Sequence, residues 1–117
     1  MEDNGSRVQA PTGALREDQS LKGEWSFMPY DSLQRVAVWY ELGAKKYAPR
    51  NWEKGLSVRE CANAAARHLF KFMWGWKDED HLAAVVWNVF AIMFYEKHVP
   101  SVLDLPRYEK EAEKQDT

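Results

Sequence analysis

The sequence has a single cysteine, Cys61, among its 117 residues. One thiol excludes an intramolecular disulfide and any multi-cysteine zinc finger, and this sparing use of cysteine fits a reducing compartment. The N-terminal residues are polar and lack the apolar segment of a secretory signal peptide. We therefore expect a cytoplasmic protein.

The sequence also lacks an excess of charge of one sign and an apolar run long enough to cross a membrane. Its formal net charge of −2 gives no electrostatic reason to bind nucleic acid. The greasiest segment, residues 82–95, is shorter than the roughly 18 residues that span a bilayer. We expect neither a nucleic acid nor a membrane as a partner. A hydrophobic content of 45% instead favours a globular domain.

Three stretches carry the signals of α-helices, and none alternates long enough with the period of two that a strand requires. Gly43 follows the first stretch and is expected to end it as a left-handed cap. Ser57 and Glu60 form a capping box at the start of the second, which Gly75 ends, and Asp78 or Asp80 caps the third. The predicted helices span about residues 31–42, 57–74 and 80–98.

These elements predict an all-α fold, a small bundle of three principal helices in which residues 44–55 form a loop. We expect residues 1–22 to be a flexible arm, 23–100 the folded domain and 101–117 a charged tail. Three helices bury only a modest core, yet the sequence has six Trp and five Phe. Some of these rings should contact a second copy of the chain, so that a homo-oligomer completes the bundle.

Asn88 is the one polar residue in the apolar run of residues 82–95. A helix that is hydrophobic all round is buried, and an amide inside it costs about 1–3 kcal/mol unless it is hydrogen-bonded. Asn88 therefore predicts a polar pocket in the centre of the fold.

Asp78, Glu79, Asp80 and His81 stand together at the start of the same helix. Their carboxylates could hold Mg²⁺, which takes oxygen ligands, and an ion that bridges phosphate oxygens could activate water. Acids at a helix N-terminus are also expected from the helix dipole alone. His68 and His81 could be bases, ligands or groups that support a metal. A histidine on an apolar helix face is also commonly a core residue.

Residues 45–54 combine Lys and Arg side chains with Tyr47 and Trp52. Cations neutralise phosphates, and a flat ring can stack on a base. One short segment therefore meets both requirements of a nucleotide. A solvated basic loop whose Trp52 fills the core would have the same composition.

Several of these strings together resemble a known phage-associated family, the dATP/dGTP diphosphohydrolase N-terminal domain. The resemblance covers about residues 25–98 and is carried by LGAKKY (42–47), RNWEKG (50–55), RHL (67–69), HLA (81–83) and Asn88. That family is similar in helical architecture to the MazG-like all-α nucleoside triphosphate pyrophosphatases.

The resemblance implies Mg²⁺- or Mn²⁺-dependent hydrolysis of dATP or dGTP to the monophosphate and pyrophosphate, in a bacterial host cytoplasm if a phage encodes the chain. The implied substrate-binding residues are Lys45, Lys46, Tyr47, Asn51, Trp52, Arg67 and Asn88. The implied metal ligands are Asp78, Glu79 and Asp80, and the implied catalytic residues are His68 and His81.

The paired acidic motifs of MazG proteins, Glu-x-x-Glu followed by Glu-x-x-Asp, are missing from this sequence. Glu41 follows Val38 at that spacing, and Glu60 precedes Asn63. Two alternatives to an enzyme therefore stay open. One is a nucleotide-binding module without turnover, and the other is an oligomeric interaction protein.

Overall fold

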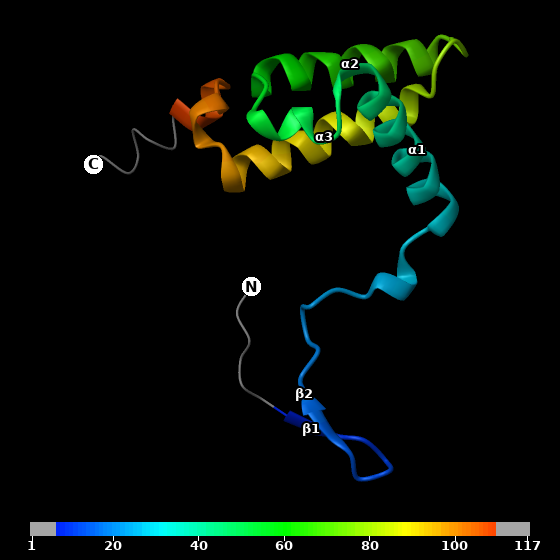
Figure 1. Cartoon of the computed structure of the whole chain (residues 1–117), viewed down its shortest axis with the longest axis vertical. Helices are drawn as coiled ribbons and strands as arrows, with labels where there is room; N and C mark the ends of the chain where they lie inside the picture. Colours follow the sequence, from blue (N-terminus) through cyan, green and yellow to red (C-terminus); the bar gives the residue numbers. More distant parts are fainter. Residues whose placement is uncertain (1–6, 110–117) are drawn as a thin grey trace. The chain divides into compact units, whose positions relative to one another are not determined.

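The computed structural model describes residues 7–109. Residues 1–6 of the predicted arm and residues 110–117 of the predicted tail lie outside the described part. The chain divides into two compact units, Met1–Tyr30 and Asp31–Thr117. Each unit is described by itself (Figure 1).

The first unit contains a short β-hairpin that the sequence did not predict. Strand β1 (Arg7–Gln9) pairs antiparallel with β2 (Leu15–Glu17), and the amide of Ala10 donates to the carbonyl of Ala14 across the turn at 2.8 Å. Gly13 has a φ of 91°, a left-handed conformation that glycine adopts readily. The expectation of no strand is wrong here because three-residue strands are too short to show alternation. A 3₁₀ turn, η1 (Trp25–Phe27), follows.

The second unit confirms the all-α prediction with three long helices. They are α1 (Tyr30–Tyr47), which begins at the junction of the units, α2 (Val58–Met73) and α3 (His81–His98), with 3₁₀ turns η2 (Asn51–Lys54) and η3 (Pro100–Val102). Helices α2 and α3 lie side by side, and α1 lies at an angle to them (Figure 1). Residues 106–109 begin a further helical turn. Among the described residues, no helix combines the length and apolarity needed to cross a membrane.

The core forms where α2 and α3 pack against each other. Val58 and Cys61 from α2 meet Ala91 and Tyr95 from α3, and all four are buried. Ala83, Ala84 and Ala91 of α3 are buried, and their small side chains take up little space in the helix packing. Apolar side chains from η2 and from the segment after α3 cover the remaining sides of this core.

Helices α2 and α3 begin at the predicted capping residues. The hydroxyl of Ser57 accepts a hydrogen bond from the amide of Glu60 at 3.2 Å, and the carboxylate of Asp80 accepts from the amide of Ala83 at 3.2 Å. Gly75, with a φ of 84°, follows the end of α2. These contacts confirm both predicted starts and the predicted stop.

The predicted end of α1 is wrong. The helix runs through Gly43, which has no positive φ, to Tyr47. Ala and Lys are strong helix formers, and the run Ala44-Lys45-Lys46 outweighs the cost of about 1 kcal/mol for one glycine. The left-handed conformation belongs instead to Ala48, with a φ of 115°, and Pro49 then prevents the helix from continuing. The predicted loop is accordingly shorter, because η2 also lies within it.

Alanine substitutions at Gly43 and at Gly75 test the different backbone conformations of these two glycines. No atom lies within 4 Å of the position that a Cβ would take at Gly43 or at Gly75. We expect Gly43→Ala to raise the free energy of unfolding by about 0.5–1 kcal/mol, because alanine loses less backbone entropy in a helix. Gly75→Ala should lower it by about 1 kcal/mol, because only its left-handed backbone opposes a Cβ. Urea unfolding measures both, and a loss of stability in Gly43→Ala would contradict the α1 boundary.

Candidate functional site

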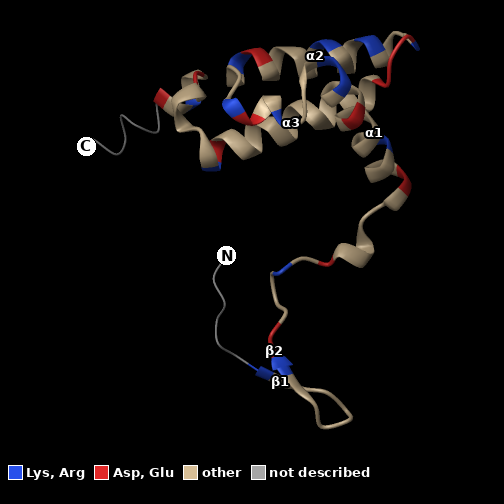
Figure 2. Ribbon diagram, viewed as in Figure 1, with Lys and Arg blue, Asp and Glu red and all other residues tan. Residues whose placement is uncertain are grey.

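A groove of about 1350 Å³ lies among α1, the η2 segment, α2 and the start of α3. Cations of the first two segments and acids of the turn before α3 line this groove. Figure 2 marks where basic and acidic residues lie along the ribbon. Of the residues predicted for the site, all except Lys45 and His81 line this groove. Segments far apart in the sequence therefore converge as the buried amide and the acidic turn suggested.

Lys45 and His81 lie outside the groove lining in different ways. Lys45 is 72% exposed at its side chain and pairs with Glu41 at 3.6 Å, without lining the groove itself. His81 is only 3% exposed and lies directly behind His68. A buried imidazole needs hydrogen-bond partners on both nitrogens.

His81 finds both partners within a chain of three side chains. Its Nε2 donates to the carboxylate of Asp78 at 2.7 Å, and its Nδ1 lies 2.9 Å from Nδ1 of His68. Because a carboxylate accepts only, the proton of neutral His81 is on Nε2, and His68 then donates into the lone pair of Nδ1. The hydrogen bond from His81 lowers the pKa of Asp78. Burial lowers the pKa of His68, although nearby Glu79 opposes the shift, and this favours the neutral imidazole.

Asp80 is engaged by α1 as well as by its own helix. Its two carboxylate oxygens accept from the guanidinium of Arg35 at 2.6 and 3.0 Å, and one of them also caps α3. The hydrogen bond from Arg35 lowers the pKa of Asp80. With Asp78 bound to His81, Glu79 is the least engaged of the three predicted metal ligands, and one of its carboxylate oxygens lies 3.9 Å from Nδ1 of His68.

Sequence reasoning missed the groove face of α1. Arg35, Trp39, Leu42 and Lys46 recur three or four residues apart and all line the groove. The ring of Trp39 contacts His68 edge-on, with centroids 6.2 Å apart. The spacing could have shown this face, but the predicted helix ended before Lys46. Nothing in the sequence could have paired Arg35 with a residue as distant as Asp80.

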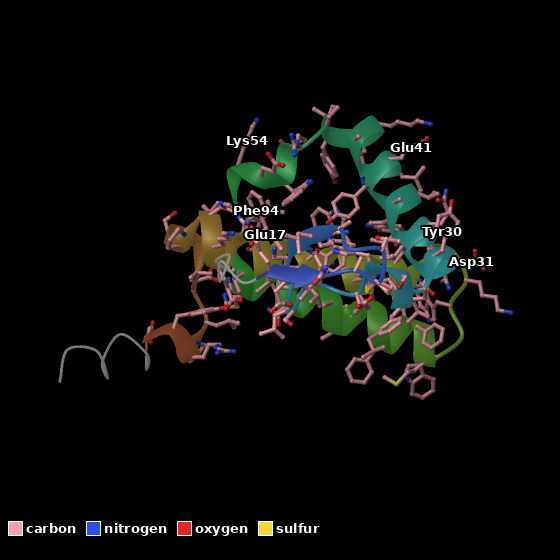
Figure 3. The ribbon with its side chains drawn as sticks, turned by 90° about the horizontal axis from the view of Figure 1, so that it is seen from below. Glu17, Tyr30, Asp31, Glu41, Lys54 and Phe94 are labelled. Atoms are coloured by element: carbon pink, nitrogen blue, oxygen red, sulfur yellow. The ribbon has the colours of Figure 1, made fainter. Side chains whose placement is uncertain are left out.

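Asn88 and Trp52 combine a structural role with a place in the groove. The Asn88 amide donates to the Ala84 carbonyl at 2.8 Å, as the cost of burying it required. The Trp52 carbonyl accepts from the hydroxyl of Tyr95 at 2.6 Å, and its ring lies 4.8 Å from that of Phe94, beneath η2 in Figure 3. Burial raises the pKa of Tyr95 to about 12, so this donor stays protonated. Trp52 therefore also packs against the core.

Three cations of the groove have no carboxylate within 4.0 Å in the part of the chain that the structure describes. They are Lys46, Arg67 and Lys71, the last of which sequence reasoning missed. Arg50, in contrast, pairs with Glu53 at 2.8 Å. Cations without ion pairs give the groove the capacity to bind an anionic ligand.

The comparisons with known proteins gave one match. The family model described as dATP/dGTP diphosphohydrolase, N-terminal, matches residues 12–104, which include all three long helices and every residue of the groove. No curated protein and no solved structure matches the chain.

Substitutions of Asp80 distinguish the stability contributed by its helix cap from that contributed by its ion pair with Arg35. Asp80→Asn keeps a capping oxygen and should cost well under 1 kcal/mol, because exposed ion pairs contribute little. Asp80→Ala also loses the cap and should cost about 1–2 kcal/mol. Urea unfolding of these variants, with Arg35→Gln and the double variant Arg35→Gln/Asp80→Asn, measures both terms. Strictly additive losses in the double variant would show that the ion pair contributes nothing.

Proposed function

Because the chain belongs to the dATP/dGTP diphosphohydrolase N-terminal domain family, we propose that its groove binds a purine deoxynucleoside triphosphate and hydrolyses it to the monophosphate and pyrophosphate. One observation carries the proposal. The groove is lined by aromatic rings, by cations that have no ion pair among the described residues, and by Asp78 and His68, the two ends of a hydrogen-bonded chain that runs through buried His81. Its volume of about 1350 Å³ is ample, since ligand pockets commonly measure about 300–1000 Å³.

The triphosphate would lie against the unpaired cations. Lys46 approaches from the end of α1, and Arg67 and Lys71 lie one turn apart on α2. Arginine binds two phosphate oxygens at once, and lysine acts as a compact charge. Together they would offset the negative charge of a polyphosphate, because no carboxylate of the described residues lies within 4.0 Å of these cations.

The base would lie against the aromatic part of the groove. Tyr40 and Trp87 line it with ring centroids 6.2 Å apart, and Trp39 and Tyr47 add two further rings from α1. Aromatic stacking contributes about 1–3 kcal/mol per base and suits a large purine ring. This supports a nucleotide rather than a simple polyphosphate as the substrate.

His68 is the group placed to accept the proton of the attacking water. The oxygen of water forms a bond to the α-phosphorus, the bond from that phosphorus to the bridging oxygen breaks, and pyrophosphate leaves with the electron pair. Neutral His68 has its Nδ1 proton bound toward His81, which leaves Nε2 to take the proton. His81 and Asp78 hold the ring in this tautomer, as the partner of a general base does.

Magnesium fits this groove as a companion of the nucleotide. Mg²⁺ takes oxygen ligands and is commonly held by one or two carboxylates together with substrate phosphates. Glu79 would be its main protein ligand, because Asp78 and Asp80 are bound to His81 and Arg35. When bound, the ion would neutralise phosphate charge. Mn²⁺ would serve in the same way, and a protein with this nucleotide chemistry would act in the cytoplasm.

The activity test incubates the full chain with Mg²⁺ or Mn²⁺ and each deoxynucleoside triphosphate, followed by chromatography of the products. We expect dATP and dGTP to yield equal amounts of monophosphate and pyrophosphate. Release of inorganic phosphate with a diphosphate would contradict attack at the α-phosphorus. Absence of products from every nucleotide at high protein concentration would refute hydrolysis.

Two neighbouring lysines provide a matched pair of variants. Lys46→Gln should lower kcat/KM about 10- to 150-fold, because a charge-assisted contact contributes about 1.5–3 kcal/mol. Lys45→Gln should leave it within a factor of two, because Lys45 does not line the groove and pairs with Glu41. Equal effects of the two substitutions would contradict the proposed phosphate position.

A nucleotide-binding module without turnover is the second candidate. The acidic pairs of MazG proteins are missing, and two of the three carboxylates before α3 are already engaged. A nucleotide would then raise the midpoint of thermal unfolding without being consumed. The same incubation, with unfolding followed in parallel, distinguishes this candidate from the enzyme.

We also propose that the chain self-associates through the C-terminal part of α2. The helix face that begins in the core at Cys61 continues to Leu69, Phe72 and Met73, whose exposed fractions are 43%, 48% and 59%. Contiguous apolar side chains on a soluble protein mark an interaction surface. The partner on this surface would be a second copy of the chain. The core of a single copy is small and leaves this part of the α2 face uncovered.

Sedimentation measurements test this surface. Phe72→Glu should shift the chain to the monomer while its helical content stays unchanged, because a carboxylate cannot be buried at an apolar contact without a partner. Leu15→Glu, at a 63% exposed side chain in the β-hairpin, is the control and should leave the assembly unchanged. A wild-type chain that is monomeric at high concentration would refute self-association.

A further inference from the structure

Two imidazole rings meet in an unusual way behind the groove. Nδ1 of His68 and Nδ1 of His81 lie 2.9 Å apart, and a carboxylate oxygen of Glu79 lies 3.9 Å from Nδ1 of His68. One ligand atom from each of these three side chains fits within a span of 4.8 Å. The residues come from the middle of α2, from the turn and from the first residue of α3.

The spacing of the two nitrogens is close to that in a metal site. A four-coordinate zinc ion binds imidazole nitrogens at about 2.0–2.1 Å, which places two such nitrogens roughly 3.3 Å apart. A separation of 2.9 Å needs to open by only a few tenths of an ångström. Glu79 is half-exposed at the groove, so its carboxylate is free to turn toward the rings.

The ring nitrogen of His81 that does not contact His68 already has the kind of hydrogen bond found in metal sites. A metal-bound histidine almost always donates its other ring N–H to a carboxylate or carbonyl, which fixes the tautomer and aims the free nitrogen at the ion. Asp78 accepts this hydrogen bond from His81 at 2.7 Å. The side chain of His81 is 1% exposed, so the ring is fixed before any ion arrives.

We propose that His68, Glu79 and His81 bind a divalent ion of the zinc class, with Asp78 as the outer partner of His81. Two imidazoles and one carboxylate suit Zn²⁺, Co²⁺ or Ni²⁺, whereas Mg²⁺ requires oxygen ligands. The site is therefore distinct in chemistry from the magnesium that would accompany a nucleotide. Three protein ligands leave the fourth position open toward the groove.

Occupancy of this site would change the tautomer of His68. A metal on Nδ1 takes the lone pair and moves the ring proton to Nε2, so that His68 no longer accepts a proton there. This consequence rests on the proposed function. If His68 is the base, Zn²⁺ inhibits hydrolysis even in excess Mg²⁺.

The test measures metal binding without any nucleotide. The full chain, free of a polyhistidine tag and stripped of metal, is titrated with Zn²⁺ against a chromophoric chelator in excess Mg²⁺. Titration with Co²⁺ reports the geometry through its visible absorption. We expect one Zn²⁺ per chain, no displacement by Mg²⁺, and the intense visible bands of four-coordinate Co²⁺.

Substitutions assign the ligands. His68→Gln and Glu79→Gln should each weaken Zn²⁺ binding at least tenfold, and Asp78→Asn should weaken it about 10- to 100-fold. His98→Gln is the matched control, because His98 lies at the other end of α3, against Phe94, and should not change the affinity. Glu79 is exposed, so its substitution leaves the fold intact, and circular dichroism verifies this for every variant.

Three results would overturn the proposal. They are an affinity unchanged in both His68→Gln and Glu79→Gln, displacement of Zn²⁺ by Mg²⁺, and a thiolate-to-cobalt absorption band, which would assign the metal to Cys61. Because nucleotide is absent, binding of Zn²⁺ with these ligands stands even if no triphosphate is hydrolysed. Failure of the metal site likewise leaves the hydrolysis test unaffected.

Discussion

The structure depends on the packing of other elements around α3, a helix that is hydrophobic on nearly all sides and leaves Val89, Phe90 and Met93 exposed. One neighbouring helix cannot cover such a surface. Helix α2 covers one side through Val58 and Cys61, and η2 and the segment after α3 cover others near Tyr95. Each covering element brings its own polar residues to the edge of the core. The groove lies where these elements meet at the beginning of α3.

Helix α1 is attached to the other two mainly through particular side chains. Arg35 binds Asp80, the ring of Trp39 contacts His68, and the ring of Tyr40 approaches Trp87. All of these contacts lie along the groove, so the residues that hold α1 in place also line the candidate site. A ligand that bridges α1 and α2 would therefore add to the contacts between the helices as well as filling the space.

The acidic and basic side chains of the groove differ in whether they already have a charged or hydrogen-bonded partner. Asp78 and Asp80 are bound to His81 and Arg35, whereas Lys46 and Arg67 have no carboxylate within 4.0 Å among the described residues. A polyanion would therefore meet positive charge without first displacing an internal partner. The acids act on their neighbours instead: Asp80 positions a helix, and Asp78 fixes the tautomer of His81.

The sequence by itself determined the fold class, two of the three long helices and their caps, because local signals such as Ser57, Asp80 and Gly75 act within a few residues. It also predicted that Asn88 is hydrogen-bonded near a polar pocket. It did not determine the end of α1, where helix propensity overrode Gly43. Nor could it show that His68 and His81 face each other or that Arg35 binds Asp80. These contacts join different helices, and only the packing of α1 and α2 around α3 brings them together.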